Sequence, residues 1–138
     1  KRSRVVVDTG VLVSAFAFDG IPEKAVKKVF AEADIYVSPA LLKEYRDVPL
    51  LLESEDKIDH LQLKTSISGI AAFTARARIV YPQKKLLVCR DPKDDMLLEC
   101  CLESKAEILI TGDKDILEIE NLPFNLKILS PRKFLEEN

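Results

Sequence analysis

Two acidic residues in this sequence each follow a short apolar segment. Asp8 comes directly after the run 5–7, three valines typical of a buried parallel strand. Asp113 follows the apolar segment 107–110 and a Thr-Gly pair. Because the carboxyl ends of parallel strands meet at one edge of a sheet, where such sheets bind ligands, we expect these two carboxylates to lie close together.

Further carboxylates can reach the same edge from the starts of helices. Asp94 and Asp95 immediately precede a predicted helix at 96–103, where either side chain could lie at the helix N-terminus. The Ser-Pro pair at 38–39 predicts the start of another helix, which places Glu44 about one and a half turns from that end. We therefore expect Glu44 to face the other acids.

Such a cluster of negative charge requires a counter-ion. Carboxylates within roughly 5 Å repel one another by about 3 kcal/mol per pair at an effective dielectric near 20. The candidate ligands are all oxygen atoms, and the chain has one histidine, His60, so the pattern favours Mg²⁺ or Mn²⁺ over Zn²⁺. These ions support in-line hydrolysis of phosphodiesters, so the predicted reaction is metal-dependent hydrolysis of nucleic acid.

Length and composition describe one ordinary globular domain. The chain has 138 residues, 47% of them hydrophobic and 32% charged, and we expect residues 1–138 to form a single domain. No apolar run approaches the roughly 18 residues that a membrane helix needs, and no secretory signal is present, so we expect a cytoplasmic protein that does not contact a membrane. The spacing of Cys89, Cys100 and Cys101 indicates plain thiols.

The net charge of −2 means that any contact with nucleic acid must use local basic patches. The best candidates surround the segment between a predicted helix and the acidic cluster. We expect a rim that binds the nucleic-acid backbone, formed by Arg76, Arg78, Lys84, Lys85 and Arg90.

Strand and helix patterns alternate along the chain. This order predicts a three-layer α/β/α sandwich with a parallel sheet of four or five strands joined by right-handed crossovers. The helix that starts at 38–39 is expected to end near Pro49, because proline removes a helix hydrogen bond. The next helix is expected within 58–75, with Leu61, Ile67 and Ile70 on its apolar face.

Other phosphate chemistries fit the sequence poorly. Nucleotide-binding loops of the Walker and dinucleotide types need glycines at fixed spacings, and the 4 glycines of this chain form neither pattern. Aspartyl-phosphate phosphatases carry a second aspartate two positions after the nucleophile, where this chain has Gly10.

Four segments of the sequence resemble the PIN domain family. They are VVVDTGVLVSAF at 5–16, SPALLKEY at 38–45, CRDPKDDMLLECCLESKAEILITGDKDIL at 89–117 and ILSPRKFL at 128–135. The resemblance spans nearly the whole chain and is greatest to small prokaryotic members regarded as toxins of toxin–antitoxin pairs. It implies a sheet with strand order 3-2-1-4-5 and an Mg²⁺- or Mn²⁺-dependent ribonuclease, with an RNA substrate, an antitoxin partner and, as in many members, a homodimer.

The resemblance also implies which residues form the site. The four acids of the family correspond to Asp8, Glu44, Asp94 and Asp113, with Asp95 as the alternative ligand one residue further on. Supporting roles fall to Thr9 and Thr111, the latter as a hydrogen-bonding partner of metal-bound water.

The sequence departs from the family pattern at Gly10, where an asparagine that braces the acids is usual. A second hypothesis is therefore a PIN-like module that binds RNA or a protein partner with weak or no catalysis.

Overall fold

The computed structural model describes residues 2–137 and consists of a parallel sheet flanked by helices. Its elements are, in chain order, β1 (Ser3–Val7), α1 (Thr9–Ala17), α2 (Ile21–Glu32), β2 (Ala33–Val37), α3 (Pro39–Ser54), α4 (His60–Ala75), β3 (Arg78–Ile79), the 3-10 turn η1 (Pro92–Asp94), α5 (Asp95–Ser104), β4 (Ile108–Ile110), α6 (Lys114–Leu117), β5 (Lys127–Leu129) and α7 (Pro131–Glu136).

The sheet has five parallel strands in the order β3-β2-β1-β4-β5, which confirms the predicted class and strand order. The central strand β1 is buried on both faces: Val5, Val6 and Val7 are each 0% exposed. This is the position that a run of β-branched residues favours. Val7 lies opposite Ile110 of β4, so the two strands end at the same level.

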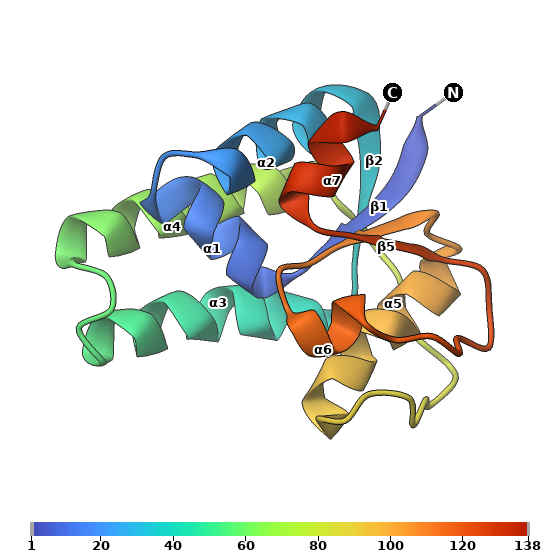
Figure 1. The fold of residues 1–138 in the computed structure, drawn as a ribbon. Helices are drawn as coiled ribbons and strands as arrows, with labels where there is room; N and C mark the ends of the chain where they lie inside the picture. The colour runs from blue at the N-terminus through green and yellow to red at the C-terminus, as the bar shows by residue number, and fades with distance from the viewer. Residues whose placement is uncertain (1, 138) are drawn as a thin grey trace.

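The helices cover the sheet so that several of them start at one edge. In Figure 1, α1, α2 and α4 lie on one side of β1 and β2, and α5 lies on the other, packed on both strands. The N-terminal ends of α1, α3, α5 and α6 gather around the carboxyl end of β1 (Figure 1). The fold thus brings to one edge the residues that precede these helices.

The prediction that α3 ends near Pro49 is wrong, because the helix continues to Ser54. Pro49 lies inside the helix and is buried, with Tyr45 one turn earlier only 2% exposed. A proline in a helix interior costs about 3 kcal/mol through its missing N–H and its ring. Burial of the apolar side of α3 against α1 and α4 offsets this cost.

The predicted apolar face of the helix within 58–75 is also partly wrong. The buried residues of α4 are Leu63, Ser66, Ile70 and Phe73, whereas Leu61 is 72% and Ile67 49% exposed. The helix passes unbroken through Gly69, where the ring of Phe16 from α1 fills the space that a Cβ would occupy.

The edge strands of the sheet are short. The β3 ladder covers only Arg78–Ile79, and β5 covers Lys127–Leu129. Within residues 2–137, no helix is both long and apolar enough to cross a membrane.

Candidate metal and phosphodiester site

Asp8 and Asp113 are connected through Thr111. The backbone N–H of Asp8 donates to the carbonyl of Ile110 at 2.9 Å and so extends the pairing of β1 with β4 by one residue. This places Asp8 beside Thr111, whose hydroxyl donates to Asp8 Oδ2 at 2.6 Å. The hydroxyl oxygen of Thr111 accepts the backbone N–H of Asp113 at 3.1 Å. The fully buried threonine therefore orients both acids.

Glu44 is held by the residue that follows Asp8. The Thr9 hydroxyl, itself only 3% exposed, donates to Glu44 Oε1 at 2.9 Å. The next residue of α3, Tyr45, donates its hydroxyl to the carbonyl of Val7 at 2.5 Å. These two bonds tie α3 to the end of β1 and direct Glu44 to the edge where the other acids lie, as its place in the helix predicts.

Asp94 and Asp95 have different environments. Asp94 is half-buried at the start of α5 and makes no capping hydrogen bond with its side chain. Asp95 is 4% exposed, and its Oδ1 accepts the backbone N–H groups of Val88 at 2.9 Å and Cys89 at 2.8 Å. Burial opposes ionisation of Asp95, but these amides keep its pKa below the ordinary value.

The pKa shifts reveal how closely the acids are coupled. Desolvation raises the pKa of Asp94 to about 6, and the negative charges of Asp113, Asp91, Asp8 and Glu44 add to the effect. Desolvation also raises the pKa of Asp8, assisted by the charges of Glu44 and Asp113 and opposed by the hydrogen bond from Thr111. The acids predicted from the sequence thus share one region of negative potential.

The donor set fits a hard divalent cation in atom type and charge. Four carboxylates from separate elements contribute only oxygen atoms, the ligands that Mg²⁺ and Mn²⁺ prefer. Nowhere in the chain from residue 2 to 137 do three acidic, thiol or imidazole side chains already converge closely enough to hold one ion. Ligation of one ion therefore requires the acids to draw closer together than they lie in this structure.

Comparison with known proteins identifies the family. A model of the PIN domain family matches residues 4–115. The chain belongs to the PIN domain family.

Relatives of this PIN domain include an uncharacterized protein of Methanocaldococcus jannaschii, 35% identical over 99% of this chain and 92% of the relative. A similar fold occurs in the crystal structure of VapBC2 from Rickettsia felis bound to a DNA fragment from their promoter. The TM-score is 0.60 at 15% identity, and the match covers 92% of this chain and 98% of the other. At that identity the structural match shows the fold alone.

The five predicted rim residues are distributed over different surfaces of the PIN domain. Lys84 and Lys85 line one hollow beside the starts of α3 and α5. Arg90 lies 3.7 Å from Asp115, close to Asp113. Arg76 stacks 4.4 Å above the ring of Phe30, on the α2 side of the molecule, and Arg78 is exposed in β3. The structure thus brings the two lysines together and separates them from Arg76.

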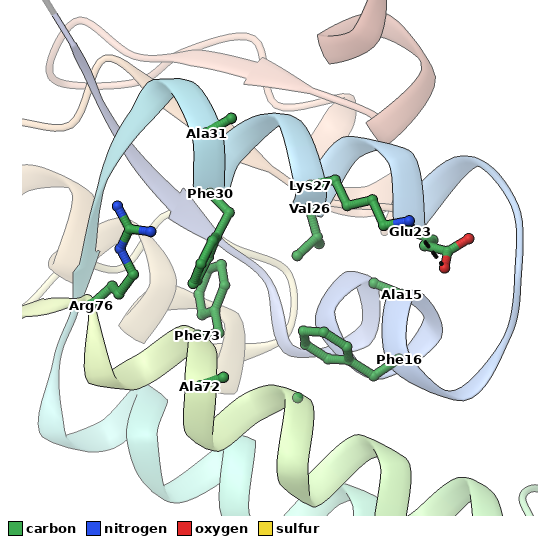
Figure 2. A pocket seen from close by; sticks show the side chains of 11 residues that line it. Ala15, Phe16, Glu23, Val26, Lys27, Phe30, Ala31, Ala72, Phe73 and Arg76 are labelled. Carbon is green, nitrogen blue, oxygen red and sulfur yellow. Dashed lines mark ion pairs between the residues drawn. The ribbon is translucent and has the colours of Figure 1, made fainter.

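A large hollow with an apolar lining lies away from the acids of the PIN domain. It has a volume of about 540 Å³ between α1, α2 and α4, and Phe16, Phe30 and Phe73 line it. Figure 2 shows the three rings and Arg76 around this hollow, with the ion pair of Glu23 and Lys27 at its rim. None of its lining residues is a predicted ligand, so it is a separate feature from the candidate site.

Proposed function

We propose that this PIN domain is a metal-dependent ribonuclease that hydrolyses RNA phosphodiester bonds at the edge formed by Asp8, Glu44, Asp94 and Asp113. The observation that carries the proposal is the meeting of these acids at one edge of the sheet, where Thr111 bonds both Asp8 and Asp113 and Thr9 bonds Glu44. A fold that brings four acids together in this way gains from a bound cation, since the cation offsets their mutual repulsion.

In this proposal, carboxylates of the protein bind the cation and neighbouring hydroxyls orient those carboxylates. Asp8, Asp94 and Asp113 bind the cation, Mg²⁺ or Mn²⁺, and Glu44 completes its ligands. Thr111 and Thr9 fix the directions of the Asp8 and Glu44 carboxylates by the hydrogen bonds described above. A cation bound there supplies Lewis acidity and activates water for in-line attack on phosphorus.

The test is cleavage of a labelled single-stranded RNA with and without Mn²⁺. We expect cleavage that requires Mn²⁺ and falls by at least about 100-fold in Asp8→Asn and Asp113→Asn, because each variant loses a charged ligand. Asp19→Asn, in the exposed turn between α1 and α2, is the matched control and should retain full activity. Cleavage without metal, or full activity in both site variants, would contradict the proposal.

A second candidate is a PIN domain that binds RNA or a protein with little catalysis, and Gly10 favours it. This position lacks the usual asparagine, yet a Cβ added there meets nothing within 4 Å. Gly10→Asn therefore fits the fold. RNA binding without cleavage in the wild type, together with cleavage in Gly10→Asn, would support this candidate against the first.

A protein partner forms part of the proposal. The similar VapBC2 structure is of a complex, and the hollow between α1, α2 and α4 leaves the rings of Phe16 and Phe30 partly exposed for a partner to cover. We infer an antitoxin-like partner that inserts apolar side chains there. Ala72→Arg, at an exposed position of the lining, should abolish its co-purification from the native host and leave RNA cleavage unchanged. Concentration-dependent sedimentation of the purified chain would instead indicate a homodimer.

A further inference from the structure

A second hollow adjoins the acidic edge. It has a volume of about 260 Å³ and lies between the start of α3, the segment 81–85 and α5. Ala40 in its wall lies four residues, about 6 Å along the helix axis, before Glu44, and Met96 follows Asp94 by two residues. The hollow therefore adjoins the helix starts that carry these two acids.

The segment that forms its outer wall is held by a row of carboxylates on α5. Glu103 Oε1 accepts the backbone N–H of Gln83 at 3.0 Å, and Glu99 Oε2 accepts that of Leu86 at 2.9 Å. Asp95 continues the row through the amides of Val88 and Cys89. The three acids are four residues apart and so lie on one face of the helix. We call residues 83–89 the strap.

The α5 carboxylates bind backbone amides of the strap and leave the side chains of Lys84 and Lys85 free in solvent. Lys84 and Lys85 are exposed, and Tyr81 at the start of this wall is 63% exposed. Glu99 also lines the hollow, but its carboxylate is engaged by the Leu86 amide. The wall therefore presents an aromatic ring and two cations, and proteins use these two kinds of group to bind single-stranded nucleic acid.

We propose that this hollow binds one nucleotide of single-stranded RNA next to the bond that is cut. The base stacks on Tyr81, and Lys84 and Lys85 bind the phosphate. Glu99 acts as a positioning residue, because it holds the strap rather than the RNA. This inference rests on the proposed ribonuclease function for the identity of the ligand, but its test does not depend on cleavage.

The test measures binding of a fluorescein-labelled ten-nucleotide single-stranded RNA by anisotropy, with a chelator present so that metal-dependent cleavage cannot occur. We expect Tyr81→Ala to weaken binding about tenfold and Tyr81→Phe to bind within about twofold of the wild type, since the ring is retained. Lys84→Gln with Lys85→Gln should weaken binding and reduce its salt dependence. Duplex RNA of the same length should show no dependence on Tyr81.

The chain offers matched controls for these variants. Phe18→Ala removes an aromatic ring that is 49% exposed at the end of α1, and Lys64→Gln removes an exposed cation on α4. Both should bind as the wild type does. Wild-type affinity in Tyr81→Ala, or equal losses in Phe18→Ala and Tyr81→Ala, would overturn the subsite.

The positioning role of Glu99 is tested separately, by hydrogen exchange of the strap. Glu99→Ala frees the Leu86 amide, so hydrogen exchange of the peptide 83–89 should accelerate and RNA affinity should fall. Glu99→Gln keeps an acceptor oxygen and should restore both. Unchanged exchange in Glu99→Ala would overturn this role.

The outcomes separate this inference from the proposed function. Metal-dependent cleavage together with RNA binding that does not depend on Tyr81 would contradict the subsite and support the nuclease proposal. Tyr81-dependent RNA binding by a protein that cleaves with no divalent ion would support the subsite and contradict the nuclease proposal.

Discussion

The hydroxyl of Thr111 donates a 2.6 Å hydrogen bond to Oδ2 of Asp8, although the two residues lie 103 positions apart in the sequence. The bond is a direct result of the pairing between β1 and β4, which ends just before both residues. It connects the fold of the sheet to the chemistry at its edge, because this hydrogen bond favours the ionised form of Asp8.

Thr111→Val should therefore weaken metal binding without disturbing the fold. Valine has nearly the same shape as threonine but cannot donate, so the pKa of Asp8 should rise and protons should compete better with the cation. We expect Mn²⁺ affinity, measured by calorimetry at pH 7, to fall about tenfold. Thr111→Ser should stay close to the wild type, and a loss as large as that of valine would show that the hydroxyl is not responsible.

The metal-free protein should lose stability as the pH rises from about 4 to about 6. The pKa of Asp94 is about 6 in the folded protein and near 3.8 ordinarily, so in this window the folded form holds a proton that the unfolded chain releases. Because solvent still reaches part of Asp94 and screens its charge, we expect the loss to be about 1 kcal/mol. Urea unfolding with a chelator at pH 4.5 and 7.5 measures it, and Asp94→Asn should show a smaller difference between the two pH values.

Asp94 and Asp95 should respond differently to the same substitution. Asn at position 95 can still accept the amides of Val88 and Cys89, so Asp95→Asn should keep the rise in melting temperature that Mn²⁺ produces. Asp94→Asn should lose that rise. Asp95→Ala leaves two partly buried amides without an acceptor and should cost about 2 kcal/mol of unfolding free energy. A Mn²⁺ response that survives in Asp94→Asn and disappears in Asp95→Asn would assign the ligand to Asp95.

Gly69→Ala should destabilise the protein despite the higher helix propensity of alanine. A Cβ at position 69 would lie 2.3 Å from ring carbons of Phe16, so the ring must leave its position between α1 and α4. We expect a loss of about 1 to 2 kcal/mol in urea unfolding. In a Phe16→Ala background the same change should be neutral or stabilising by up to about 1 kcal/mol, and equal effects in both backgrounds would contradict the explanation.

The alternation of strand and helix patterns predicted the layers of this fold, whereas the strand order came from the family resemblance. The errors arose where tertiary packing overrides local preference. Pro49 continues a helix because its surroundings bury that side of α3. Leu61 and Ile67 have apolar side chains, but α1 and α3 contact α4 on another side.

The arrangement of the candidate site could be predicted only in part from the sequence. Placement of Asp8 and Asp113 at one edge follows from strand ends, a rule that needs no contact information. The contrast between Asp94 and Asp95 was not predictable, because it depends on amides of a segment without regular structure. The spacing of Asp95, Glu99 and Glu103 was a visible signal, but acids on a helix ordinarily face solvent.

Because β3 and β5 are short, copies of the protein at high concentration have little edge strand through which to associate. These strands form the two borders of the sheet, and their ladders extend over only two and three residues, Arg78–Ile79 and Lys127–Leu129. An incoming strand from another molecule would find few backbone partners on either border, so the fold offers little template for aggregation through strand addition.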